Sequence, residues 1–138
     1  MRVELVVALP REERSVPVAR HIVRAAMGTL GVADTCTADI EVALSEACTN
    51  VLEHAGPSDE YEVRLDVDGD RCVLRVVDVG DTPGRVRFEV PTDPPSEDAE
   101  HGRGLVLMQA LVDQVGFNTL SEKGTVVSLE KRLTYSEP

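Results

Sequence analysis

Two segments with alternating apolar residues, joined by a short polar turn, constrain the fold of this chain more than any other feature. Apolar residues recur with a period of two in residues 61–67 and again in residues 72–79. Such alternation predicts β-strands with one buried face. The Asp68-Gly69-Asp70 sequence between them is typical of a tight turn. Because the connection is so short, the two strands must pair antiparallel and begin a sheet that needs a covering layer.

The remaining elements are predicted from the same two periodicities. Alternation predicts three more strands, over residues 2–9, 117–120 and 125–133. Helical spacing of apolar residues predicts three helices, with Ser15 and Thr37 as N-caps of the first two and Gly116 as the end of the third. We therefore expect one α+β domain spanning residues 1–138. Its architecture would be a two-layer sandwich of a mixed, mostly antiparallel sheet with helices on one face.

Composition excludes several functional classes. The chain has 14 Lys and Arg residues against 25 Asp and Glu, a net charge of −11, which argues against direct nucleic-acid binding. No apolar stretch approaches the roughly 18 residues of a membrane-spanning helix, so we predict no membrane partner. The three cysteines lack a C-x-x-C pair, and Cys48 and Cys72 fall in apolar patterns as core residues. This usage fits a reducing cytoplasm.

A polar row marks the second predicted helix, residues 38–55. Glu46, Asn50 and His54 are each four residues apart, so they share one helix face. Taken alone, such a row is more often a solvated surface. An Asn amide oxygen is nevertheless a ligand that suits Mg²⁺, and a nearby carboxylate can take a proton from a hydroxyl or a water.

A second candidate site ends the predicted strand 72–79. Asp78 lies on the same face as the apolar residues of that strand, which aims a carboxylate toward the core. A buried carboxylate needs a hydrogen-bond donor, and the exocyclic amine of adenine is one. Gly80 would let a flat ring lie against the backbone. The alternative is an ordinary turn in which Asp78 only terminates the strand.

A third candidate site is Gly102-Arg103-Gly104, where the third helix begins. Free N–H groups at a helix start favour an anion, and glycines let a phosphate approach closely. Neither a P-loop nor a Rossmann fingerprint is present. The preceding residues 81–101 are rich in proline and acidic residues, and a loop of this length is often a lid. The alternative is a disordered insertion.

In their order and spacing these motifs resemble the four sequence boxes of the GHKL (Bergerat-fold) ATPases. The boxes here are Glu46-x-x-x-Asn50-x-x-x-His54, Asp78-x-Gly80, Gly102-x-Gly104-Leu105 and Gly124-Thr125. The segment Ser45-Glu46-Ala47-Cys48-Thr49-Asn50 is most similar to bacterial anti-sigma-factor serine-protein kinases. The resemblance covers nearly the whole chain and implies the histidine-kinase-like ATPase fold.

The resemblance also implies roles for individual residues. Glu46 would be the general base, Asn50 would bind Mg²⁺, and Arg20 would contact a protein partner. The nucleotide contacts would come from residues at the adenine end and at the phosphates, with residues 81–101 as the ATP lid. These contacts are Asp78, Gly80 and Thr125 for adenine, and Gly102, Arg103, Gly104 and Leu105 for the phosphates.

The implied function is that of an ATP- and Mg²⁺-dependent protein serine/threonine kinase and anti-sigma factor. Its implied partners are an anti-anti-sigma protein with a STAS domain, a sigma factor and a second copy of the chain, all in the cytoplasm. Family members often have glycine where this chain has Thr82. This difference motivates an alternative, a nucleotide-gated regulatory binding module with little or no kinase activity. A detached histidine-kinase ATPase domain is a third hypothesis, which the lack of a preceding phosphoacceptor helix disfavours.

Overall fold

The computed structural model describes residues 1–53, 59–78, 103–120 and 124–137. The elements in these ranges follow the predicted order of strands and helices. They are β1 (Arg2–Pro10), α1 (Ser15–Leu30), α2 (Asp34–Glu53), β2 (Glu60–Asp68), β3 (Arg71–Asp78), α3 (Arg103–Leu111), β4 (Gln114–Leu120) and β5 (Gly124–Arg132). The predicted hairpin is confirmed, and Gly69 in its turn has a φ of 62°, which glycine adopts without strain.

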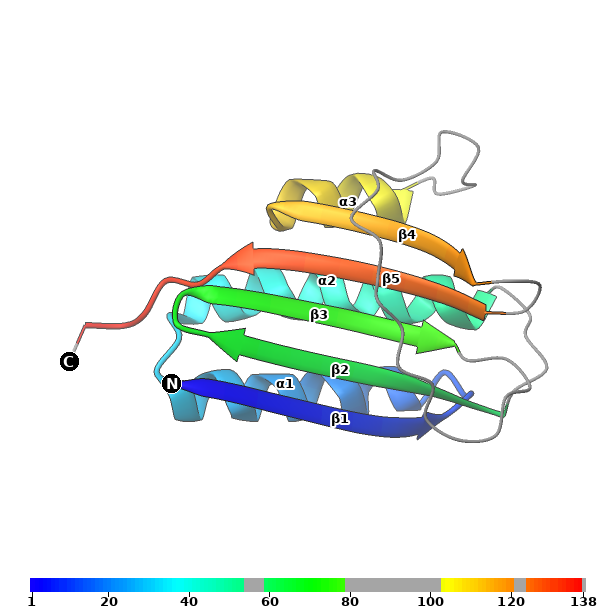
Figure 1. Ribbon diagram of the computed structural model, residues 1–138, viewed down its shortest axis with the longest axis horizontal. Helices are drawn as coiled ribbons and strands as arrows, with labels where there is room; N and C mark the ends of the chain where they lie inside the picture. The colour runs from blue at the N-terminus through cyan, green and yellow to red at the C-terminus, as the bar shows by residue number, and fades with distance from the viewer. Residues whose placement is uncertain (54–58, 79–102, 121–123, 138) are drawn as a thin grey trace.

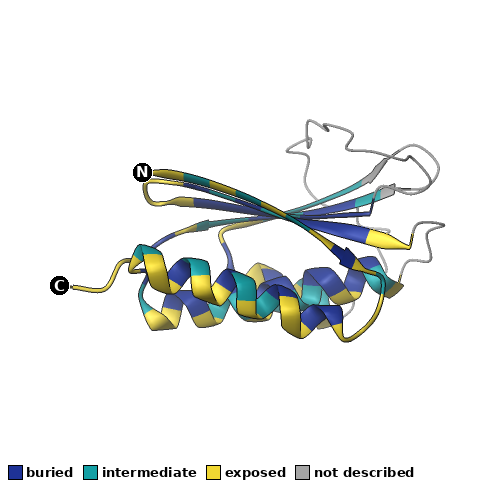
Figure 2. Ribbon diagram, turned by 90° about the horizontal axis from the view of Figure 1, so that it is seen from below, coloured by how far each residue is buried: buried dark blue, intermediate teal, exposed yellow. Residues whose placement is uncertain are grey.

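Within the described ranges, the five strands form one sheet in the order β1-β2-β3-β5-β4. Every neighbouring pair is antiparallel. The helices cover one face of this sheet, and α2 lies between α1 and α3 (Figures 1 and 2). The predicted two-layer α+β sandwich is therefore confirmed, but the described sheet is wholly antiparallel, where a mixed, mostly antiparallel sheet was predicted. Because α2 packs behind the middle of the sheet, it is a rigid platform for the side chains that it carries.

The core between the two layers is built from aliphatic side chains, as the absence of tryptophan requires. Ile40, Leu44 and Val51 of α2 are at most 1% exposed and pack in one cluster with residues of the central strands. Burying side chains of this size stabilises the fold by about 1.5–3 kcal/mol each. This apolar stripe fixes the rotation of α2 about its axis. It therefore determines which way the polar row of the same helix faces.

Both predicted N-caps are wrong. Ser15 is the first residue of α1, where its buried hydroxyl donates to the carbonyl of Glu12 at 2.6 Å and hydrogen-bonds with Tyr61. Helix α2 begins at Asp34, and Thr37 lies inside it, with its backbone N–H bonded to the carbonyl of Ala33 at 2.9 Å. The tertiary contact of the Ser15 hydroxyl with Tyr61 competes with capping. None of the described helices is long and apolar enough to cross a membrane.

The predicted end of α3 is also wrong. The helix ends at Leu111, and Gly116 lies in β4, paired with Ser128. The backbone N–H of Asp113 already bonds to the carbonyl of Glu130 at 2.9 Å, so the chain has joined the sheet by then. Val115 fits both a helical and an alternating pattern. A short apolar run cannot separate the two by period alone.

Candidate active site

The polar row of α2 is not a solvated surface over its described part. Asn50 is only 9% exposed, and Glu46, one turn earlier on the same side, is half-buried. An amide and a carboxylate at this depth are removed from bulk water, where electrostatic interactions are stronger. The row therefore has the setting that a reaction site needs. His54, its third predicted member, lies outside the described residues.

The first turn of α3 brings a second predicted site onto this row. A Cβ atom built on Gly104 would lie only 3.1 Å from Oε2 of Glu46. Any residue with a side chain would therefore crowd the carboxylate. Arg103 begins the helix on the exposed side, and Leu105 is half-buried. Residues predicted to bind phosphate thus lie beside the predicted base, although nearly sixty positions separate Glu46 and Gly104 in the chain. Gly102 lies outside the described residues.

The third predicted site lies at the end of the central strands. Asp78 closes β3 and is 1% exposed, which confirms that its carboxylate points inward. Thr125 is its direct neighbour in the sheet, opposite Asp78 on β5. A carboxylate and a hydroxyl are thereby presented side by side at one end of the sheet. Gly80 and the predicted lid, residues 81–101, lie outside the described residues.

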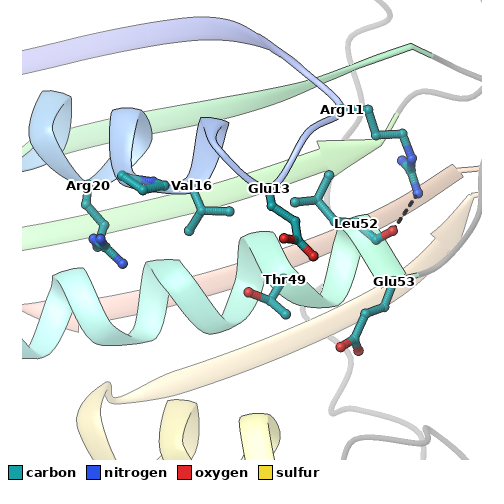
Figure 3. Close-up of a pocket in the computed structure, with 8 residues that line it drawn as sticks. Arg11, Glu13, Val16, Arg20, Thr49, Leu52 and Glu53 are labelled. Carbon is teal, nitrogen blue, oxygen red and sulfur yellow. Dashed lines mark hydrogen bonds between the residues drawn. The ribbon is translucent and has the colours of Figure 1, made fainter.

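Sequence reasoning missed the cation that accompanies Asp78. Nη1 of Arg11, from the connection between β1 and α1, donates to Oδ2 of Asp78 at 2.6 Å. Nη2 of the same guanidinium donates to the carbonyl of Val51 at 2.8 Å and reaches that of Leu52 at 3.4 Å, the bond drawn in Figure 3. No local sequence pattern could predict this contact, because 67 positions separate Arg11 from Asp78.

Arg20 lines a pocket of about 510 Å³ between α1 and α2, to which Arg11 also contributes (Figure 3). Its guanidinium donates to the hydroxyl of Ser45 at 3.2 Å. Both polar and apolar residues line the pocket. They are Arg11, Glu13, Val16, Pro17, Arg20, Thr49, Leu52 and Glu53. Thr49 faces this pocket from the residue next to Asn50 (Figure 3).

The cysteines take no part in the site. Burial raises the pKa of the Cys48 thiol and of the Cys72 thiol to about 12, so both stay protonated. Both are buried, which confirms the core role predicted for Cys48 and Cys72, and Cys36 is buried as well. Across the described ranges, no group of three His, Cys, Asp or Glu residues could hold a metal ion. A Mg²⁺ ion at Asn50 would share its coordination with phosphate oxygens and water, as this ion usually does.

Comparison with known proteins defines the class. Residues 9–131 match the family model of the histidine kinase-like ATPase domain. Because this match spans most of the sequence, the chain belongs to that family, and the predicted ATPase resemblance is confirmed. The family assignment agrees with the geometry: a nucleotide requires sites for both of its ends, and the structure has polar sites beside α3 and at the end of β3.

Relatives with similar sequences are serine-protein kinases. The serine-protein kinase RsbW of Bacillus velezensis is 30% identical over 134 residues, which cover 91% of this chain and 82% of that protein. The protein of the same name from Bacillus subtilis is 33% identical over 104 residues. That alignment covers 69% of this chain and 64%, just under two thirds, of the relative.

A solved structure shares the fold. The crystal structure of the RsbU and RsbW domains of a Mycobacterium tuberculosis protein superposes with a TM-score of 0.72 at 23% sequence identity. The superposition covers 95% of this chain and 32% of that longer one. At this identity the likeness supports the fold alone.

Proposed function

We propose that this protein is an ATP-dependent serine/threonine kinase and anti-sigma factor, which phosphorylates an anti-anti-sigma STAS protein and sequesters a sigma factor. The observation that carries the proposal is the contact between Gly104 and Glu46. It puts a carboxylate beside a helix start that suits phosphate. A base that activates a hydroxyl for attack on a terminal phosphate must lie beside that phosphate, and the Glu46 carboxylate has this position.

In this proposal ATP would span the two polar sites. Asp78 and Thr125 would recognise adenine together with Gly80, whereas Gly102, Arg103, Gly104 and Leu105 would line the phosphates under residues 81–101. Asn50 supplies an amide oxygen that fits Mg²⁺, and the ion, when bound, neutralises phosphate charge. The buried setting of Asn50 and Asp78 supports these assignments, because hydrogen bonds and charge interactions are stronger away from bulk water.

Glu46 would act as general base toward the partner's hydroxyl. Its carboxylate takes the proton while the hydroxyl oxygen forms a bond to the γ-phosphorus. The bond between that phosphorus and the β–γ bridging oxygen breaks, and ADP leaves with the electron pair. Glu46 is half-buried, which shields it from water and leaves it reachable from one side.

A transfer assay tests the proposal. The protein is mixed with Mg²⁺, γ-labelled ATP and a purified STAS-domain partner, and label on the partner is followed over time. Label on a serine or threonine of the partner supports the kinase. ATP binding without label transfer supports the alternative, a nucleotide-gated binding module, which the Thr82 departure motivates. Absence of ATP binding contradicts both.

We also propose that the protein forms a homodimer and is located in the cytoplasm. Light scattering tests the homodimer, and cell fractionation tests the cytoplasmic location.

Substituting alanine for Gly104 is expected to slow phosphotransfer without unfolding the protein. The added Cβ would lie 3.1 Å from Oε2 of Glu46, so the carboxylate must move by a few tenths of an ångström. Misplacing a catalytic group by about 1 Å can cost on the order of 100-fold in rate, and we expect a loss of about tenfold here. Single-turnover rates and a thermal melt measure the two effects. The matched control is Gly28→Ala, since a Cβ atom added to Gly28 would meet no neighbouring side chain or strand within 4 Å.

Arg20→Ala is expected to weaken partner binding by about tenfold or more and to leave ATP affinity unchanged. A central arginine at an interface commonly contributes about 2 kcal/mol or more, and Arg20 lines the pocket beside α1. Arg24→Ala is the control, because Arg24 lies one turn further along α1 and pairs with Glu41 at 3.0 Å. Calorimetric titration with the STAS partner measures both variants. Equal losses in the two would show that Arg20 has no specific role.

A further inference from the structure

We infer that Arg11 is a positioning residue for adenine recognition, which holds the Asp78 carboxylate in place and ties it to the helix that carries Asn50. This inference rests on the proposed ATP site. Arg11 lies outside all four motifs and follows the strand that ends at Pro10. Its role comes entirely from where the fold places its guanidinium.

The guanidinium joins two elements that face the proposed nucleotide from different sides. One nitrogen donates to Oδ2 of Asp78 at 2.6 Å, at the end of β3. The other donates to the carbonyl of Val51 at 2.8 Å, in the last turn of α2. Carbonyls in the last turn of a helix lack intrahelical partners and favour a cation. A planar, forked cation can satisfy both groups at once, whereas an ammonium is a single point charge.

The contact between Arg11 and Asp78 is buried. The Arg11 side chain is 13% exposed and that of Asp78 only 2%. Burying an ionised carboxylate without a cation is strongly unfavourable. Arg11 thus places a cation directly against a carboxylate that lies at this depth. It also sets the position of that acceptor relative to α2, and hence relative to Asn50 one residue before Val51.

Pairing with Arg11 is compatible with adenine binding. An ionised carboxylate has about four acceptor sites on its two oxygens, so a bond to one oxygen does not exhaust it. The 6-amino group of adenine can donate to such an acceptor. Hypoxanthine, the base of inosine triphosphate, carries a 6-oxo group instead. Its oxygen is an acceptor, so it would face the Asp78 carboxylate without forming a hydrogen bond. A fixed Asp78 therefore predicts a preference for ATP over inosine triphosphate, by at least about tenfold for a hydrogen bond to a charged group.

Measuring the affinities of both nucleotides tests the inference. Calorimetric titrations of the intact protein with Mg·ATP and with Mg·inosine triphosphate give the ratio for wild type and Arg11→Met. We expect Arg11→Met to lose about tenfold in ATP affinity and to change inosine triphosphate affinity little, so that the preference disappears. Arg11→Lys should recover part of it, because a lysine keeps the charge and loses the second contact.

Controls separate positioning from a general loss of structure. Arg14→Met makes the same substitution three residues on at an exposed site and should leave the ratio unchanged. In an Asp78→Asn background, Arg11→Met should change the ratio no further, and this double variant also avoids an unpaired buried charge should the single variant fail to fold. The inference is overturned if Arg11→Met binds ATP normally, or loses both nucleotides in equal proportion. It falls with the proposed function if wild type binds neither.

Discussion

Replacing Glu46 by Gln is expected to lower the rate of phosphotransfer by about 10²–10⁴-fold, the usual contribution of a positioned general base. The amide keeps the size of the carboxylate beside Gly104 but cannot take up the hydroxyl proton. ATP affinity should change little, because the proposed adenine contacts at Asp78 and Thr125 lie at the end of the sheet. Single-turnover transfer to the STAS partner, with calorimetric titration of ATP, separates the two quantities.

Glu41→Gln is the matched control for this experiment. Glu41 lies on the same helix, but its carboxylate is engaged by Arg24 at 3.0 Å and is therefore directed toward α1. It should transfer phosphate at the wild-type rate. A Glu46→Gln protein that keeps more than about a tenth of the wild-type rate would show that Glu46 is not the base. The carboxylate would then have a structural role beside α3.

Asn50→Ala is expected to remove most of the gain in ATP affinity that Mg²⁺ provides. The amide oxygen of Asn50 is the proposed Mg²⁺ ligand. Residues that only hydrogen-bond to a metal ligand commonly contribute about 10–100-fold to metal affinity. Loss of the ligand itself should therefore cost at least this much. ATP titrated in the presence of a chelator should bind both proteins alike. Titrations with and without Mg²⁺ therefore isolate the effect of the ion from that of the nucleotide.

Thr49→Ala controls for damage to this turn of α2. Thr49 is the preceding residue, but it is exposed and lines the pocket toward α1 (Figure 3). The ATP affinity of this variant should respond to Mg²⁺ as that of wild type does. If Mg²⁺ strengthens ATP binding to Asn50→Ala as much as to wild type, the ion is held elsewhere.

The strands and helices could be predicted where one periodicity dominates. Alternation in residues 61–67 and 72–79, with glycine in the turn, leaves only a hairpin. The helical spacing of apolar residues likewise predicted the helix α2. Prediction failed where a local signal competes with tertiary contacts. Ser15 is typical of a cap, but its hydroxyl bonds to Tyr61 across the core, and Gly116 is typical of a helix end, but β5 pairs with that segment as a strand.

The sequence by itself determined the order of the elements, the aliphatic core and the residue types of the candidate site. Four short motifs in the right order indicated the ATPase family, because each chemical task needs a particular residue at a particular spacing. Only the tertiary structure decided which residues meet. It buried Asn50, brought Gly104 against Glu46 and placed Arg11 on Asp78. The physical reason is that local periodicity fixes which face of an element is apolar, whereas packing fixes which polar groups share a buried space.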